Sequence, residues 1–322
     1  MNDSHVIYHW GDNLPYNSAV ERLKERYGGR LQKISLATGF TCPNRDGRVG
    51  RGGCSFCNNE SFVPFYAHGK DINHQIDEGL KFLRERYPRT ALFLGYFQAY
   101  TNTYGTFEDI KRLYLQVLSR PEIGGIVIGT RPDCVDERLL DFFSQLSREY
   151  FVSIEYGVES TSDEVLRRVN RGHDYATAVR AIEMTHSRGI HTAAHFMWGL
   201  EDSLENMPKE VDEINRLPLD SIKFHQLQII RGTALEKDWE EDRGGYHIFS
   251  IEEYTHFIID VLERLRPDLP VERFISETPP RYRRSPLWGT DLRVPQMREA
   301  IIRKMREEKR WQGRIFSLNS HR

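Results

Sequence analysis

Strand-like and helix-like segments alternate along most of the chain, and this alternation restricts the possible folds more than any other feature. Strand character is found at residues 31–36, 91–97, 125–129, 151–157, 191–199 and 221–230. Apolar residues at helical spacing predict helices at residues 71–87, 107–118, 136–148, 162–169, 175–187 and 204–216. Strands that alternate with helices pair in parallel through right-handed crossovers, so we expect an α/β protein.

Two architectures satisfy this pattern, an open doubly wound sheet and a full or partial (β/α) barrel. No Gly-x-Gly-x-x-Gly motif follows the first strand, so a nucleotide-binding Rossmann start is unsupported. Both architectures bind ligands at the carboxyl ends of their strands. The loop after the first predicted strand therefore lies where a functional loop is expected.

That loop holds three of the four cysteines of the chain. Residues 42–57 read Cys-Pro-Asn-Arg-Asp-Gly-Arg-Val-Gly-Arg-Gly-Gly-Cys-Ser-Phe-Cys. The glycines allow positive φ angles and the close approach of the backbone to a bulky group. Three thiolates on such a loop predict a metal site with one coordination position unfilled. The fourth cysteine, Cys134, stands alone and is interpreted as a small buried hydrophobic residue.

Three kinds of metal site are compatible with Cys42, Cys54 and Cys57. A structural zinc site needs four ligands, so Cys134 or a histidine would have to complete it. A catalytic zinc is less suited, because donation from three thiolates weakens its Lewis acidity. An iron–sulfur cluster on three thiolates leaves one iron free for an exogenous ligand, and S-adenosylmethionine (SAM) is the obvious candidate. Phe56 is expected either to lie beside the adenine or to pack under the loop.

Composition excludes some classes of protein. The 322 residues are 39% hydrophobic and 29% charged with a formal net charge of −2, which suits a soluble globular protein. No apolar run approaches the roughly 18 residues that span a bilayer, and residues 1–8 lack signal-peptide features. We therefore expect a cytoplasmic protein without membrane contact. Residues 281–322 carry twelve Lys or Arg against four Asp or Glu, which predicts either a solvated helical face or contact with a polyanion such as RNA.

The cysteine motif resembles the radical SAM superfamily. More narrowly, it is similar to the bacterial YhcC-type family, which is itself similar to the catalytic subunit of Elongator. The resemblance extends from residue 16 to about residue 316 and includes residues 97–104, 128–133, 155–160, 170–173 and 227–233. One feature departs from the common Cys-x₃-Cys-x₂-Cys spacing, because eleven residues separate the first two cysteines here. Elongator-like relatives also have an enlarged first gap.

The resemblance implies a partial (β/α)₆ TIM-like barrel of the radical SAM type over residues 30–248. An N-terminal extension at 1–29 precedes the barrel, and a helical, basic C-terminal extension at 249–322 follows it. That extension contains expected helices at 251–265 and 295–310 and a possible strand at 271–276. The resemblance also implies a [4Fe-4S] cluster on Cys42, Cys54 and Cys57.

Contacts to SAM are likewise implied by the resemblance, and no residue is assigned a catalytic role. The superfamily's Gly-Gly-Glu segment is absent, so Gln98 is the nearest candidate for the methionine ammonium. Glu159 is expected at the ribose hydroxyls, or else at the favourable N-terminus of the next helix. Arg171 suits the methionine carboxylate. The expected adenine contacts are Phe56, Met197 and the backbone around Gln226, and His225 and Gln226 are candidate substrate contacts.

The resulting expectation is a radical SAM enzyme. Its reduced cluster would cleave SAM to methionine and a 5′-deoxyadenosyl radical, which abstracts hydrogen from a substrate. A tRNA base, in particular a wobble uridine, is the favoured substrate, and flavodoxin or ferredoxin is the expected reductant. The alternative is a zinc-stabilised, non-enzymatic protein that binds RNA through residues 281–322.

Overall fold

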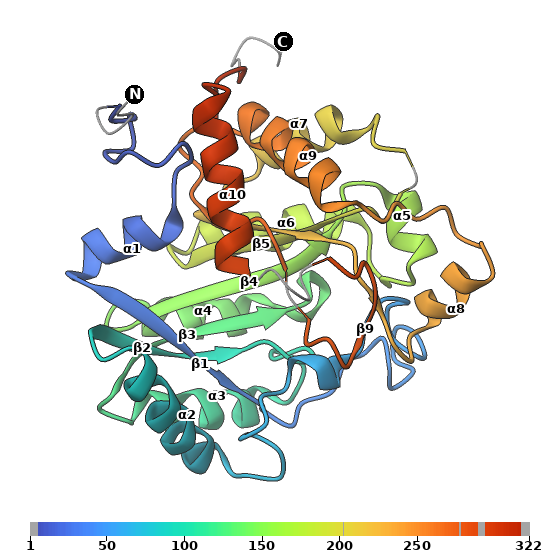
Figure 1. Ribbon diagram of the computed structural model, residues 1–322. Helices are drawn as coiled ribbons and strands as arrows, with labels where there is room; N and C mark the ends of the chain where they lie inside the picture. The colour runs from blue at the N-terminus through green and yellow to red at the C-terminus, as the bar shows by residue number, and fades with distance from the viewer. Residues whose placement is uncertain (1–5, 202, 277, 289–293, 317–322) are drawn as a thin grey trace.

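Seven parallel strands form one curved sheet in the computed structural model, which describes residues 6–201, 203–276, 278–288 and 294–316. Neighbouring strands follow the order β1-β2-β3-β4-β5-β6-β8. Their bounds are β1 (Arg30–Leu36), β2 (Thr90–Phe97), β3 (Ile123–Thr130), β4 (Phe151–Glu159), β5 (His191–Trp198), β6 (Ser221–Gln226) and β8 (Val271–Arg273). The sheet curls into a half-barrel with helices around it, which is the predicted partial barrel rather than an open sheet (Figure 1).

Several helices begin where the sequence supplies capping residues. Asp71, Thr106, Asp136, Ser162 and Asp174 each accept a hydrogen bond from the first turn of the helix that follows, which satisfies backbone donors that have no partner inside the helix. The helices are α1 (Ala19–Tyr27), α2 (Ile72–Arg86), α3 (Phe107–Leu118), α4 (Glu137–Leu146), α5 (Asp163–Arg168), α6 (Tyr175–His186), α7 (Met207–Arg216), α8 (Ala234–Glu240), α9 (Ile251–Arg264) and α10 (Val294–Glu307).

The two faces of the sheet are built differently. Ile126, Ile128, Ile154 and Tyr156 are fully buried in the main core, together with apolar side chains of the surrounding helices. Residues of alternating position point to the opposite face of a strand. On β4, Glu155 lies between Ile154 and Tyr156 and therefore points to the opposite, inner face of the barrel. That face is available for polar groups.

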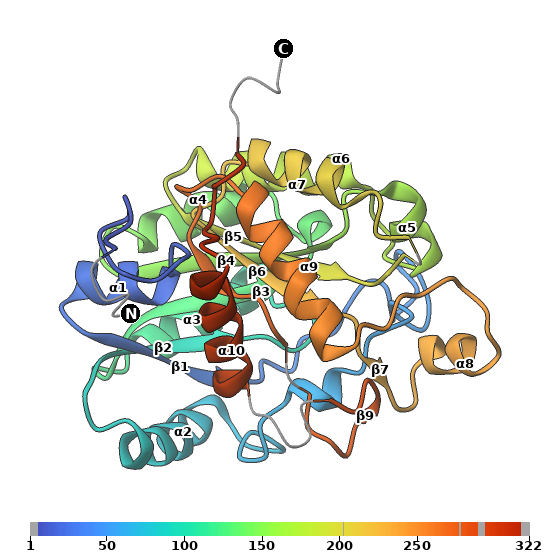
Figure 2. The same ribbon diagram turned by 45° about the horizontal axis from the view of Figure 1, so that its top comes forward.

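The predicted C-terminal extension also contributes to the barrel. Val271–Arg273 pairs with β6 as a seventh parallel strand, so the sheet has one strand more than the six of the expected (β/α)₆ barrel. The expected strand at 221–230 is interrupted after Gln226. Its last part, β7 (Ile229–Ile230), pairs antiparallel with β9 (Arg283–Ser285), which the sequence did not predict. Figure 2 shows α9 and α10 over the same side of the molecule.

Several cationic side chains of the basic C-terminal segment form ion pairs within the described part of the molecule. Arg310 contacts Asp260 and Glu263, and Arg314 contacts Glu263. Arg284 lies 3.5 Å from Glu240 of α8. Acidic groups outside the segment therefore offset part of its positive charge. In the described ranges, no helix is both long and apolar enough to cross a membrane.

Candidate active site at the cysteine loop

A cavity of about 370 Å³ lies at the carboxyl ends of the parallel strands. Every candidate site residue from the sequence lines it, four of them from the loop after β1 and the others from later strand ends and loops. These residues are Cys42, Cys54, Phe56, Cys57, Gln98, Glu159, Arg171, Met197 and Gln226. The parallel topology brings them together because the carboxyl ends of parallel strands meet at one edge of the sheet. Their individual chemical roles stay predictions.

The eleven residues between Cys42 and Cys54 form a folded hairpin. Asp46 and Arg51 form an isolated antiparallel bridge across it. The side-chain amide of Asn170 donates to the Gly53 carbonyl over 2.8 Å. In the other direction, the side-chain amide of the fully buried Asn44 donates to the backbone carbonyl of Asn170. The long segment between the first two cysteines is therefore folded and hydrogen-bonded to the turn after α5.

Gly172 lies against this hairpin. Its φ is +76°, and a Cβ placed there would lie 2.8 Å from Val49 Cγ1 and 3.1 Å from Asn44 Oδ1. Both the left-handed backbone and the lack of space therefore require glycine. The cysteine loop and the Asn-Arg-Gly-His motif at 170–173 pack as one unit.

Gly172→Ala is expected to lower the free energy of unfolding by about 2–4 kcal/mol, because steric conflict adds to the backbone cost. Gly28→Ala is the matched control, since Gly28 has a φ of +68° and no heavy atom within 4 Å of its added Cβ. The control should lose only about 1–2 kcal/mol. Urea unfolding of both variants measures the difference, and equal losses would show that the hairpin does not press on Gly172.

Two side-chain donors approach the sulfur of Cys54. Arg171 Nη1 lies 3.3 Å from Cys54 Sγ, and Asn44 Nδ2 lies 3.6 Å from it. Burial, followed by the neighbouring Cys54, raises the pKa of Cys57 to about 12, against the opposing effect of Arg45. All four cysteines are free, and the three in the loop would bind a metal centre as thiolates.

Arg171 and Glu159 form a constrained pair on the cavity wall. The guanidinium of Arg171 donates to the Gly157 carbonyl, and its Nη2 lies 3.9 Å from Glu159 Oε1. Glu159 has a φ of +76°, and the pairing of β4 with β5 shifts register between Gly157 and Glu159. A bulge of this kind re-aims a side chain, and non-glycine residues with such a φ are concentrated at functional sites.

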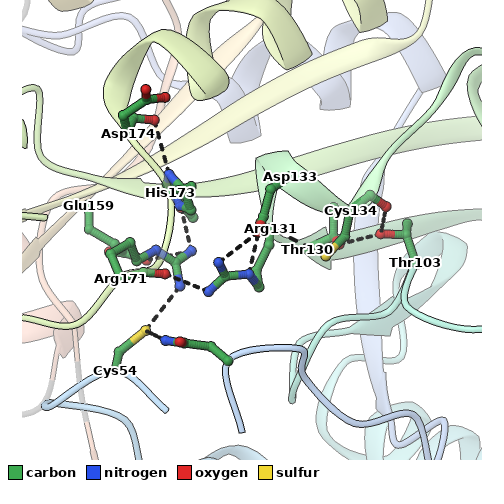
Figure 3. A network of polar contacts seen from close by, with 12 residues as sticks. Cys54, Thr103, Thr130, Arg131, Asp133, Cys134, Glu159, Arg171, His173 and Asp174 are labelled. Atoms are coloured by element: carbon green, nitrogen blue, oxygen red, sulfur yellow. Dashed lines mark hydrogen bonds and ion pairs between the residues drawn. The ribbon is translucent and has the colours of Figure 1, made fainter. Parts of the chain in front are cut away.

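Arg131 contacts the backbone of Arg171. The sequence alone did not identify Arg131 as part of the site. Its Nη1 donates to the Arg171 carbonyl over 2.7 Å, while Asp133 accepts from its Nε and Nη2 over 2.8 and 2.9 Å (Figure 3). The Arg-Pro-Asp sequence after β3 was a signal for such a pair. Arg131 thereby fixes the position of the Arg171 backbone.

The predicted contacts to the adenine come from the loop after β1 and from β5 and β6, whereas Gln98 follows β2. Phe56 and Met197 are partly buried against an apolar cluster that includes Leu200 and Leu227. The Gln226 side chain donates to the Ser276 carbonyl and accepts from the Ser276 N–H, both over 2.8 Å. The side-chain amide of Gln226 is therefore already hydrogen-bonded within the protein. The predicted adenine contact at this position remains one of the backbone.

An ion-pair network that the sequence did not predict occupies the barrel interior. We call Lys33, Glu155, His195, Lys223 and Glu272 the inner network. Glu155 Oε1 lies 2.9 Å from Lys33 Nζ and 2.6 Å from Lys223 Nζ, and its Oε2 lies 3.1 Å from His195 Nε2. Burial alone would raise the pKa of Glu155, but Lys223 and Lys33 hold it well below its usual range. Charged residues within strands of a barrel were the signal in the sequence.

Glu272 makes stability depend on pH. Burial would raise its pKa, but Lys223 and Lys33 outweigh that effect and lower the pKa to about 2. In the unfolded chain this carboxyl has a pKa of about 4.3, so the unfolded state binds the proton first as the pH falls. We expect the free energy of unfolding to decrease between about pH 4.5 and pH 2. Urea unfolding across this window should show a shallower decrease for Glu272→Gln, and an unchanged slope would contradict the assignment.

The amino-acid sequence matches two family models. The radical SAM superfamily matches residues 41–214, and the radical SAM C-terminal domain matches residues 219–307. Protein YhcC of Escherichia coli is 33% identical over 269 residues, which cover 83% of this chain and 85% of that relative. Elongator complex protein 3 of Homo sapiens is 26% identical over 189 residues, or 57% of this chain and 32% of that protein.

Among solved structures, the Elp3 protein of the archaeon Methanocaldococcus infernus has a similar fold. The TM-score is 0.64 at 17% identity, over 88% of this chain and 64% of that one. This chain thus spans less than two thirds of the archaeal protein. The similarity supports the curved barrel and its C-terminal region.

Proposed function

The chain belongs to the radical SAM superfamily, and we propose that Cys42, Cys54 and Cys57 hold the [4Fe-4S] cluster that this family uses together with SAM. The observation that carries the proposal is the position of the three thiols on one cavity that also contains Arg171 and Glu159. When bound, the two cofactors supply reductive cleavage of SAM and a carbon radical. The chain itself supplies the binding groups and the shape of the cavity.

Arg171 is proposed to bind the carboxylate of SAM. Its Nε is buried and has no hydrogen-bond partner, so a ligand oxygen would satisfy it. Glu159 beside it is proposed to accept from the ribose hydroxyls, and Gln98 to accept from the ammonium group. Phe56, Met197 and the backbone at Gln226 would contact the adenine.

Release of 5′-deoxyadenosine tests this proposal. Protein reconstituted anaerobically with iron and sulfide, then mixed with SAM and a strong reductant, should produce 5′-deoxyadenosine. A preparation with a full cluster that produces none would contradict the proposal. In the cell, flavodoxin or ferredoxin is the proposed electron donor.

A tRNA base, with a wobble uridine favoured, is the proposed substrate. The similarity to Elongator complex protein 3 supports this choice. Mass spectrometry of tRNA nucleosides from a deletion strain and its parent provides the test. An altered nucleoside that is restored by the parent gene but not by a Cys54→Ala gene is the expected result. An unchanged nucleoside profile would exclude tRNA as the substrate.

The zinc-stabilised, non-enzymatic alternative is not favoured. It needed Cys134 or a histidine as the fourth ligand. Cys134 belongs to the short turn after β3 and is absent from the lining of the cavity, and its carbonyl accepts from Thr103 Oγ1 over 2.6 Å. The match of residues 41–214 to the radical SAM superfamily supports the enzyme instead.

A further inference from the structure

Arg273 of β8 is a cation in the cavity that the proposed cofactor contacts do not use. It lines the cavity together with Tyr96 of β2 and His225 of β6. In the described part of the chain, no carboxylate lies within ion-pair distance of its guanidinium. An unpaired guanidinium facing a cavity is suited to bind a planar or tetrahedral oxyanion through paired N–H donors.

The irregular edge of the sheet explains how Arg273 reaches the cavity. Ile222 pairs with Val271, whereas the next residue, Lys223, pairs with Arg273. Glu272 is therefore an additional residue in β8, and such a bulge changes the direction of neighbouring side chains. Glu272 joins the inner network while Arg273 also lines the cavity.

The inner network explains why the charge of Arg273 stays available. Glu155 and Glu272 are the neighbouring carboxylates, and both lie within 3.5 Å of Lys223 and within 2.9 Å of Lys33. Ser221 donates to Glu272 over 2.7 Å as well. Two lysines thus neutralise two carboxylates, and the charge of Arg273 is left in excess.

His225 and Tyr96 add neutral donors beside this cation. Nε2 of His225 is buried without a hydrogen-bond partner. Burial, followed by the charges of His195, Arg273 and Lys223, lowers the pKa of His225 well below its usual range, against the opposing effect of Glu155. Burial likewise raises the pKa of Tyr96, so its hydroxyl keeps its proton. A neutral imidazole and a phenol each offer one donor to an acceptor.

We propose that Arg273, His225 and Tyr96 form a subsite that binds an oxyanion of the substrate, either a carboxylate or a phosphate group. The subsite lies between β2, β6 and β8, whereas the thiols lie on the loop after β1. The inference extends the proposed function, because it assigns this side of the cavity to substrate rather than to SAM.

Calorimetric titration of the full-length, cluster-loaded protein with inorganic phosphate, and separately with acetate, tests the subsite. Whichever anion binds more tightly identifies the preferred group. Arg273→Gln should weaken binding by about tenfold or more, since a charged hydrogen bond is lost. Arg284→Gln is the control, because Arg284 belongs to the same C-terminal region but does not line the cavity. Its affinity should equal that of the parent.

Two further measurements make the result specific to the site. Tyr96→Phe removes only a hydroxyl and should weaken binding by about two- to tenfold, which keeps the proposal testable if Arg273→Gln does not fold. Histidine ring ¹⁵N spectra should show a shift of His225 when the anion is added. A parent protein that binds neither anion, or an Arg273→Gln variant that binds as the parent does, would overturn the proposal. These titrations need no SAM, so a failure of the proposed cofactor role would be recognised separately by missing 5′-deoxyadenosine.

Discussion

Cys54→Ala should reduce the iron bound after anaerobic reconstitution from roughly four per chain to nearly none. Cys54 is the buried member of the three thiols and the one that receives side-chain donors from Arg171 and Asn44. Two remaining thiolates cannot hold a cluster that needs three protein ligands. Iron and sulfide analysis, together with the visible absorption of the anaerobic protein, measures the effect.

Cys134→Ala is the matched control for this experiment. Cys134 does not line the cavity that holds the three thiols of the loop, and it belongs to the short turn after β3. The control should bind iron and release 5′-deoxyadenosine as the parent does. Equal loss of iron in both variants would contradict the assignment of the cluster to the cysteine loop.

Glu155→Gln is expected to lower the free energy of unfolding by about 3–5 kcal/mol. Glu155 is fully buried as a side chain and is the carboxylate that Lys33, Lys223 and His195 share. The amide keeps the shape of the side chain but leaves two ammonium groups with a single carboxylate, Glu272. Because an uncompensated buried charge costs far more than a lost surface pair, the effect should be large. Urea unfolding at neutral pH measures it.

Arg303→Gln is the control for the burial argument. Arg303 and Glu307 form an ion pair on α10, and both side chains are more than half exposed to solvent. The loss should stay within about 0.5 kcal/mol. If Glu155→Gln cost no more than Arg303→Gln, the inner network would not carry buried charge.

Local sequence patterns were sufficient for most of the secondary structure. The helix predicted at 107–118 is observed as Phe107–Leu118, since Thr106 caps it and its apolar residues recur at helical spacing. The strand at 271–276 was harder to place. Only three of its residues form β8, and their partner β6 lies about fifty positions earlier in the chain. No local pattern specifies such a distant pairing.

The sequence predicted those site residues that lie at the ends of predicted strands. Gln98 and Glu159 follow or end their strands, and parallel strands bring such positions to one edge. Arg273 and the inner network were missed for a physical reason. Whether a charged residue is paired or free depends on which side chains the fold places beside it.

The sequence by itself determined the class of fold and the three thiols of the loop, because periodicity and cysteine spacing are local properties. Only the tertiary structure decided that the eleven-residue gap is a docked hairpin and that Arg171 lies beside Cys54. It also decided that two lysines neutralise Glu155 and Glu272 while Arg273 remains unpaired among the described residues. These are contacts between residues far apart in the chain, and they exist only once the sheet has closed into its half-barrel.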